Sequence, residues 1–237
     1  MKMRAKSPAK DWYEIRAKAD ESAEILIYDQ IGEDWFGEGV SAKKFLDELK
    51  ALDAKEINLR INSPGGSVFD GVAIFNALVR HKAKITVHVD GLAASIASVI
   101  ALAGDSLRMA ENSLFMVHNP HAVVMGEASD MLKMADTLNK IRGTMLDTYM
   151  HHANVSRREM AAMMDQETWL DASEAKEIGF VNEITPALRM AACFDLSGYK
   201  KVPDQLLNNR QNLAAVKSRV AHLSTIAARV RQERSKV

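Results

Sequence analysis

The feature that most constrains the fold is a β-branched run that ends in glycine and passes directly into an alanine-rich apolar run. Residues 83–90 read AKITVHVD, and their apolar side chains alternate as in a strand with one buried face. Residues 93–103 are apolar on almost every side, which predicts a helix buried all round. Ser95, in the linking sequence GLAAS, is therefore expected at a strand-to-helix turn, where unpaired amides carry partial positive charge. Its hydroxyl can serve there as a nucleophile or as an ordinary helix N-cap.

Strand-like and helix-like segments alternate along most of the chain. Apolar patterns predict strands at residues 24–30, 56–62, 106–109, 114–117 and 180–184. Helical patterns lie between them, at residues 41–52, 67–80, 127–152 and 172–179. Strands joined by helical crossovers indicate an α/β fold with a largely parallel sheet and covering helices.

The helix predicted over residues 127–152 is long for a domain of this size. Its apolar stripe consists of Met131, Met134, Leu138, Ile141 and Met145. Methionine-rich stripes usually belong to a core. A helix of this length can also project from the domain and pack against another subunit.

Composition sets limits on the class of protein. The 237 residues suffice for one α/β domain with an appendage. No apolar run reaches the roughly 18–20 residues of a membrane span, and the charged start is no secretory signal. Cys193 is the only cysteine, so we expect no intrachain disulfide, and a cytoplasmic location. No Cys/His cluster resembles a zinc site, and no metal is expected.

The formal charge of zero conceals an asymmetry. Residues 188–237 carry a net charge of +7 and residues 1–187 a net charge of −7. A basic tail on an acidic body indicates an appendage with its own partner, such as the body of a neighbouring subunit, or a merely solvated tail. Within it, an a/d heptad pattern predicts a self-associating helix, a helix docked on the body or a frayed tail; its residues are Leu213, Val216, Val220, Leu223, Ala227 and Val230. We expect a variable lead over residues 1–20, a main domain over 21–186 and a basic helical extension over 187–237.

Three further segments supply candidates for chemistry around Ser95. The loop NSPGGS (62–67) has paired glycines that let amides approach a ligand, although the same letters suit an ordinary turn. His118 follows an apolar strand, and an imidazole pKa of about 6.5 suits a general base. Asp165 and Glu167 are carboxylates that can accept the imidazole N–H. Taken singly, a lone histidine is usually structural and each carboxylate a surface charge.

Taken together, the motifs INSPGGS (61–67), GLAAS (91–95), MVHNP (116–120) and ASEAKEIGFV (172–181) carry a family resemblance. In this order the chain resembles the proteolytic subunit of the Clp protease, a serine peptidase family with the ClpP/crotonase-like fold. The resemblance covers about residues 24–184. It implies repeated strand–helix units with a long projecting helix.

The resemblance also implies roles for particular residues. Ser95 is the expected nucleophile, His118 the general base, and the amides of Gly66 and Ile96 the oxyanion hole. The family usually has aspartate as the third member of the triad, and Glu167 stands at that position, with Asp165 in reserve. The implied substrate is polypeptide, with no metal and no diffusible cofactor. The implied assembly is a homo-oligomeric ring, stacked in pairs through the 127–152 helix.

Two regions depart from the family pattern. A charged lead replaces the axial hairpin and first helix of the usual subunit, and the C-terminal extension of about 50 residues is foreign to it. Both features resemble the phage and prophage branch, in which such proteases act in capsid maturation. The expected partners are therefore phage capsid or scaffold proteins, or an AAA+ unfoldase, and neither nucleic acid nor membrane.

Three other functions remain compatible with parts of the sequence. A signal-peptide-peptidase-like hydrolase would use a Ser–Lys dyad, with Lys133 or Lys140 as the base. An assembly protein with a vestigial active site would explain the heptad tail and the glutamate at position 167. A crotonase-type hydratase for acyl-CoA would share the fold but has no need of Ser95 and His118.

Overall fold

The computed structural model describes residues 11–32, 41–188, 194, 196–203 and 206. The chain divides into two units, Met1–Phe194 and Asp195–Val237, and each is considered by itself. In the second unit the description is limited to a short stretch with a turn, in which the Tyr199 N–H donates to the Leu196 carbonyl at 3.1 Å. The predicted heptad helix over residues 213–230 lies outside the described residues, as does Cys193. The predicted boundaries at residues 20 and 186 stay predictions.

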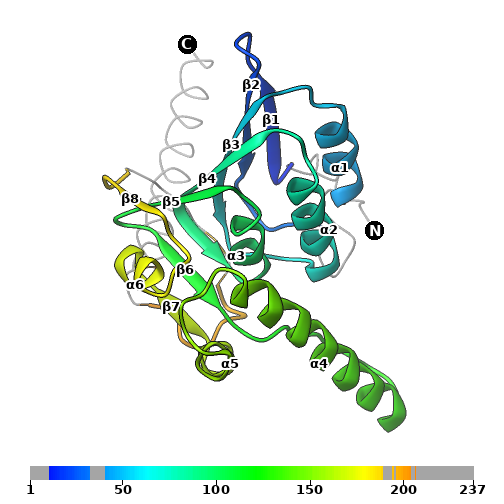
Figure 1. Cartoon of the computed structure of the whole chain (residues 1–237). Coiled ribbons are helices and arrows are strands. Elements are labelled where there is room, and N and C mark those ends of the chain that lie inside the picture. Colours follow the sequence, from blue (N-terminus) through cyan, green and yellow to red (C-terminus); the bar gives the residue numbers. More distant parts are fainter. Residues whose placement is uncertain (1–10, 33–40, 189–193, 195, 204–205, 207–237) are drawn as a thin grey trace, which may run out of the picture. The chain divides into compact units, whose positions relative to one another are not determined.

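The first unit contains one mostly parallel sheet, ordered β1-β2-β3-β4-β5-β8, with β6 and β7 attached beside β4 (Figure 1). Its strands are β1 Tyr13–Ala17, β2 Ser22–Ile27, β3 Glu56–Ser63, β4 Lys84–Ala94, β5 Ser106–Ala110, β6 Leu114–Val117, β7 Thr168–Leu170 and β8 Glu183–Thr185. Only the β1–β2 and β6–β7 pairs are antiparallel among the described strands. The helices are α1 Ala42–Ala51, α2 Val68–Val79, α3 Ile96–Ala101, α4 Ala128–Met150, α5 Arg157–Asp165 and α6 Ala172–Glu177. The predicted α/β fold is confirmed.

The core lies between the sheet and helices α1, α2 and α3, which cover one of its faces (Figure 1). Ile25, Leu59 and Val87 pair across β2, β3 and β4, and all three are fully buried. Their alternation with polar residues is what one buried sheet face requires. Polar residues gather on the other face, where Arg60 makes a bidentate ion pair with the buried Asp90 at 2.6 and 2.7 Å.

Strand β4 changes partner halfway along its length. Its first part pairs with β5, from Thr86 to Val89, and its last three residues pair with β6. Strand β3 adjusts to this change with an irregularity between Ile61 and Ser63. The fork therefore brings the carboxyl ends of β3, β4 and β6 together, which is where ligands bind in open α/β sheets.

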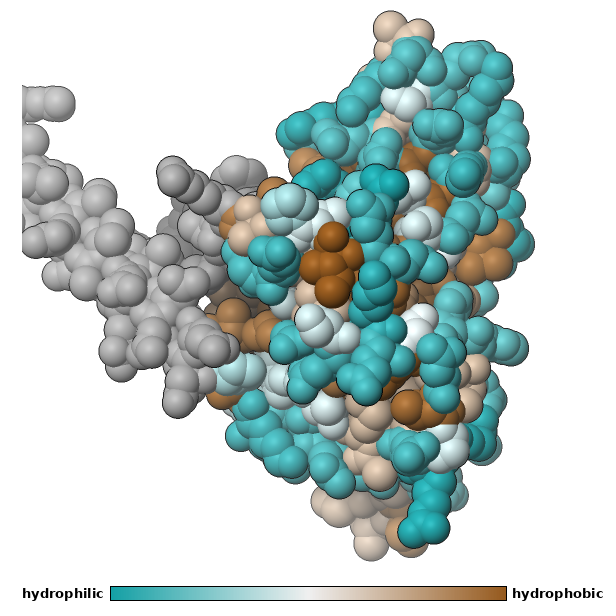
Figure 2. Space-filling model, turned by 60° about the vertical axis from the view of Figure 1, so that its left-hand side comes forward, coloured by the Kyte–Doolittle hydropathy of each residue, from teal (hydrophilic) through white to brown (hydrophobic). Residues whose placement is uncertain are grey.

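Helix α4 runs outward from the rest of the first unit (Figure 1). Its C-terminal part is anchored by the buried residues Met145, Leu146 and Tyr149. Its N-terminal part is exposed, and Met131 and Leu132 expose 49% and 69% of their surface. The predicted methionine stripe thus belongs to the core only at its C-terminal end. From another side, the described surface is mostly hydrophilic, with small scattered apolar patches (Figure 2).

The structure differs from the sequence prediction at four elements. Residues 91–94 continue β4 and α3 begins only at Ile96, so the helix start predicted at residue 93 is wrong. Pairing with β6 overrides the helical preference of the alanines. Strands β1 and β7 and helix α5 were not predicted. Within the described residues, no helix is both long and apolar enough to cross a membrane.

Candidate active site

Ser95 occupies the turn between β4 and α3 in a strained backbone conformation. Its φ of 56° and ψ of −128° are rare for a residue other than glycine, and such strain persists only where the surroundings fix it. The Ser95 N–H donates to the Met116 carbonyl at 3.1 Å, and the Ser95 carbonyl accepts the Ser98 N–H at 3.0 Å. The hydroxyl makes no capping bond to α3. The N-cap alternative therefore does not describe how this side chain is used.

His118 lies against the Ser95 hydroxyl. Its Nε2 is 2.7 Å from Ser95 Oγ, and each residue exposes only 7% of its surface. The pairing of Ala94 with Met116 in the β4–β6 ladder brings the two residues beyond the strand ends together. A neutral imidazole at this distance can accept the hydroxyl proton.

The pKa of His118 is lowered to about 4, chiefly because burial disfavours the charged imidazolium. The electrostatic effect of His121, whose ring centroid is 5.5 Å away, lowers the pKa of His118 further, and that of Glu167 raises it. At neutral pH the imidazole is therefore uncharged and in the form that a general base requires.

Glu167 lies opposite His118 in the antiparallel β6–β7 pair. The last paired residues are Val117 and Thr168, so one further step of the register puts His118 beside Glu167. Glu167 is 9% exposed, and its φ of 52° is a second strained conformation at this site. The indole N–H of Trp169 donates to Glu167 Oε1 at 3.3 Å, which helps to hold the carboxylate.

Asp165 has other partners. Its Oδ1 accepts hydrogen bonds from Asn119 Nδ2 and from an Arg142 guanidinium N–H, both at 2.8 Å. These two bonds lower the pKa of Asp165, and its side chain is largely exposed. The geometry therefore favours Glu167 over Asp165 as the carboxylate next to His118.

The loop Pro64-Gly65-Gly66 passes directly over Ser95. A Cβ atom added at Gly65 would lie 2.8 Å from Ser95 Cβ and 3.4 Å from Ile96 N, and the φ of Gly65 is +99°. Only glycine fits both constraints. The Gly65 carbonyl accepts the Ile31 N–H at 2.8 Å. Because carbonyl and N–H point in opposite directions across a trans peptide, the Gly66 N–H points away from Ile31.

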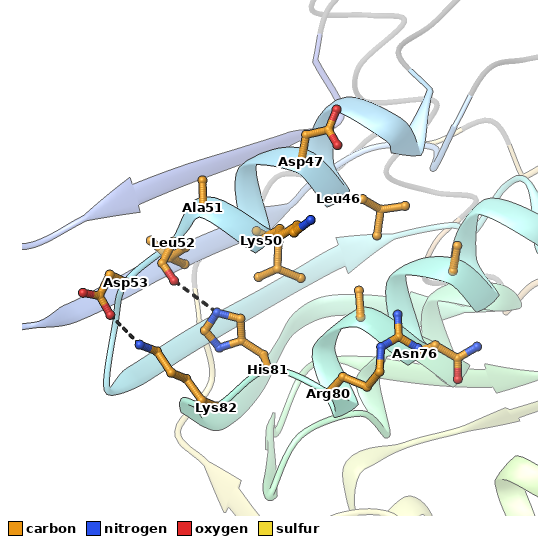
Figure 3. A pocket seen from close by; sticks show the side chains of 13 residues that line it. Leu46, Asp47, Lys50, Ala51, Leu52, Asp53, Asn76, Arg80, His81 and Lys82 are labelled. Atoms are coloured by element: carbon orange, nitrogen blue, oxygen red, sulfur yellow. Dashed lines mark hydrogen bonds and ion pairs between the residues drawn. The ribbon is translucent and has the colours of Figure 1, made fainter.

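Two cavities formed by described residues of the first unit lie away from Ser95. The larger, of about 840 Å³, lies between α1 and α2 beside the His81–Leu52 hydrogen bond and the Lys82–Asp53 ion pair (Figure 3). A second, of about 430 Å³, lies beside His151 and His152. Ser95, His118 and Glu167 line neither of them. Among the described residues, no three His, Cys, Asp or Glu side chains are grouped as metal ligands would be.

A mostly parallel α/β sheet with a buried serine–imidazole pair at a strand end is an arrangement typical of hydrolytic enzymes. The model of the Clp protease family matches residues 7–187, and the chain belongs to this family of peptidases. A Clp protease proteolytic subunit from Bacteroides fragilis is 33% identical over 139 residues, which are 57% of this chain and 67% of that protein. Another, from Deinococcus radiodurans, is 30% identical over 158 residues, which are 64% of this chain and 78% of that protein.

Sequence reasoning singled out the side chains that meet at this site but missed several that surround them. Ser98 hydrogen-bonds to the Ser95 carbonyl, and Tyr149 hydrogen-bonds in turn to Ser98. Trp169 hydrogen-bonds to Glu167. The spacing of Ser98, three residues after Ser95 on a predicted helix, is the one signal that pointed toward any of them.

Proposed function

We propose that this chain is a serine endopeptidase that cleaves polypeptides through an acyl-enzyme. The observation that carries the proposal is the 2.7 Å contact between Ser95 Oγ and His118 Nε2, two side chains that are both buried at the carboxyl end of the sheet. A depressed histidine pKa and a strained serine turn support the same conclusion, since both are arrangements that active sites favour.

The reaction has two balanced stages. Ser95 Oγ attacks the carbonyl carbon of the scissile peptide bond while His118 Nε2 takes the hydroxyl proton. The resulting oxyanion accepts hydrogen bonds from the Gly66 and Ile96 N–H groups, and its collapse breaks the C–N bond as His118 protonates the departing amine. Water then attacks the acyl-enzyme, gives a proton to His118 and releases the carboxyl product, and Ser95 recovers its proton.

Glu167 is the proposed third member of the triad. A carboxylate there accepts the second N–H of the imidazole and so keeps Nε2 ready to receive the serine proton. The support is the register of β6 and β7 and the effect of Glu167 on the pKa of His118. The extra methylene of glutamate, relative to the usual aspartate, is accommodated by the strained backbone at position 167.

The substrate is an extended polypeptide. The Gly65 carbonyl pairs with Ile31 and the Gly66 N–H points away from Ile31, which supports an extended peptide lying edge-on along the Pro64-Gly65-Gly66 loop beside Ser95. Lys133 and Lys140, the bases of the Ser–Lys alternative, lie on the exposed half of α4, where Lys133 approaches Asp130 at 3.7 Å. This placement favours His118 as the base.

Stacked homo-oligomeric rings in the cytoplasm are the proposed assembly. The exposed apolar residues Met131 and Leu132 on the projecting half of α4 support α4 as the ring–ring contact. Docking of an AAA+ unfoldase is one proposed use of such rings. Maturation of a phage capsid is the other, supported by the charged lead and the +7 extension, and a bacterial host's cytoplasm would then be its location.

A fluorophosphonate probe tests the catalytic proposal. Wild type and the matched control Ser113→Ala should be labelled, whereas Ser95→Ala should not. If wild type stays unlabelled under conditions that label an ordinary serine peptidase, the vestigial assembly protein becomes the better reading. For the capsid role, co-expression with a candidate capsid protein should give processing with wild type and none with Ser95→Ala. Equal processing by both would remove that role.

A further inference from the structure

A buried chain of hydrogen bonds connects α4 to the backbone of the candidate nucleophile. Tyr149 Oη on α4 is 2.8 Å from Ser98 Oγ on α3, and Ser98 Oγ is 2.5 Å from the Ser95 carbonyl oxygen. Ser98 and Tyr149 are both completely buried. Every other residue of α3 is apolar and buried, so Ser98 carries the single side-chain hydroxyl of this buried helix.

The direction of this chain follows from counting donors. A serine hydroxyl has one hydrogen, and Ser98 donates it to the Ser95 carbonyl. The contact between Tyr149 and Ser98 therefore has the tyrosine O–H as donor and Ser98 Oγ as acceptor. Donation runs one way, from Tyr149 through Ser98 to the carbonyl oxygen of Ser95.

The carbonyl at the end of the chain belongs to the same peptide group as the Ile96 N–H. It also accepts the Ser98 N–H at 3.0 Å. Hydrogen bonds to the oxygen of an amide draw electrons from its nitrogen and make the N–H a stronger donor, and bonds in series reinforce one another in a low-dielectric interior. The peptide plane is fixed by the same bonds, which sets the direction of the Ile96 N–H.

We propose that Ser98 and Tyr149 are positioning residues that orient and polarise the Ser95–Ile96 peptide, so that its N–H stabilises the oxyanion of the transition state. This inference rests on the proposed function, in which Ile96 supplies one of the two oxyanion donors. Neither side chain touches the substrate, and both act through the backbone between the nucleophile and α3.

A second buried serine provides a matched control. Ser113 is 1% exposed, and its hydroxyl donates to the Ala110 carbonyl, three residues earlier, at 2.7 Å. This repeats the local geometry of Ser98 at the turn between β5 and β6. Removing either hydroxyl deletes the same kind of hydrogen bond, but only Ser98 is bonded to the Ser95–Ile96 peptide.

The test compares Ser98→Ala, Tyr149→Phe and Ser113→Ala with wild type in the full chain. The measurements are kcat and KM for a fluorogenic peptide, thermal midpoint, fluorophosphonate labelling, and the inhibition constant of a matching peptide aldehyde. Ser95 Oγ adds to the aldehyde carbon, and the resulting oxygen occupies the oxyanion site. Loss of a direct oxyanion donor lowers kcat by about 10²–10³-fold, so loss of its support should cost roughly 10-fold in Ser98→Ala and about 3-fold in Tyr149→Phe.

The expected pattern separates positioning from structure. The aldehyde inhibition constant should rise by the same factor as kcat falls, while KM, the acid limb of the pH profile and the Ser113→Ala enzyme stay unchanged. Ser98→Thr, which keeps the hydroxyl, should retain most of the activity.

Three results would overturn the inference. The first is a wild-type kcat in both Ser98→Ala and Tyr149→Phe. The second is a lowered kcat with unchanged aldehyde affinity. The third is an equal loss of kcat in Ser113→Ala. If Ser98→Ala does not fold, Tyr149→Phe decides alone, since it removes one oxygen atom. An unlabelled wild type would instead refute the proposed function, so the two failures are distinguishable.

Discussion

The segments around Ser95 and Glu167 both hold a strained backbone conformation, but different structural elements support them. Both residues hold a positive φ, 56° and 52°, that is unfavourable for a side chain. Ser95 follows the eleven-residue strand β4 and is surrounded by buried core residues. Glu167 lies between the nine-residue helix α5 and the three-residue strand β7, which pairs only with β6 among the described strands. The proposed nucleophile is thus part of the core, and the proposed third member of the triad lies at its margin.

This difference indicates which part of the site can vary. A change near Ser95 disturbs the ladder, the core and the chemistry together. A change near Glu167 disturbs one short strand pair, so the margin is where glutamate can replace aspartate. Substitutions on the two sides of the site should therefore differ in their effects on activity.

Ser95→Ala should remove nearly all activity at the core side of the site. Without the hydroxyl no acyl-enzyme forms, and the loss in kcat should be on the order of 10⁶-fold, as for other serine triads. Peptide hydrolysis at equal protein concentrations of wild type and Ser95→Ala measures it. Circular dichroism should show an unchanged fold. Residual activity above one per cent of wild type would contradict the assignment of Ser95.

Glu167→Gln should lower kcat less, by about 10³–10⁴-fold, because the imidazole loses orientation but keeps its contact with Ser95. Asp165→Asn is the matched control, since it neutralises a nearby carboxylate that bonds to Arg142 and Asn119. The loss of kcat in Asp165→Asn should stay below about 10-fold. If the two variants exchange these effects, Asp165 is the acid of the triad.

The acid limb of kcat/KM should lie near pH 4, because the pKa of His118 is lowered to about 4 and only neutral imidazole accepts the serine proton. Glu167 raises this pKa, so Glu167→Gln should move the limb to lower pH. His121 lowers it, so His121→Ala should move the limb to higher pH. Rate profiles from pH 3 to 8 measure both shifts, and shifts of the opposite sign would contradict the assigned causes.

The backbone strain should appear as a small gain in stability when glycine is introduced. Ser95→Gly should unfold with a free energy about 1 kcal/mol higher than Ser95→Ala, and Glu167→Gly about the same amount higher than Glu167→Ala. Urea denaturation of the four variants measures the differences. A gain at one position only would show that the two turns are not equivalently strained.

The same division explains what sequence could predict. Ser95, His118 and the glycine loop lie in contiguous motifs at strand ends, so residue order alone brought them together. Helix α5 begins with a capping box formed by Ser156 and Glu159, a sequence pattern from which the start of this helix could have been predicted. Strand β1 is held by the packing of Trp12 on Phe45, whose ring centroids are 5.6 Å apart and which lie far apart in sequence.

Other features were beyond reach for a physical reason. Residues 91–94 have the composition of a helix, and only the β4–β6 pairing makes them strand. Ser98 and Tyr149 are 51 residues apart, so no local pattern in the sequence could show that their side chains meet. The preference for Glu167 over Asp165 came from the family resemblance, and the register that supports it lies in β7, a strand too short to show periodicity.

The partner change in β4 also has a consequence for how this protein tolerates variation. Residues 92–94 belong to the β4–β6 ladder, residues 92–96 are all buried, and Ser95 is the proposed nucleophile, so a replacement there has several requirements to satisfy together. Residues on the exposed half of α4 have no such overlapping duties within the described chain. A saturation library selected for folding of the single chain should therefore retain few variants at residues 92–96 and many along that half of α4. The proposed ring–ring contact on α4 can therefore change in sequence without disturbing the fold around Ser95.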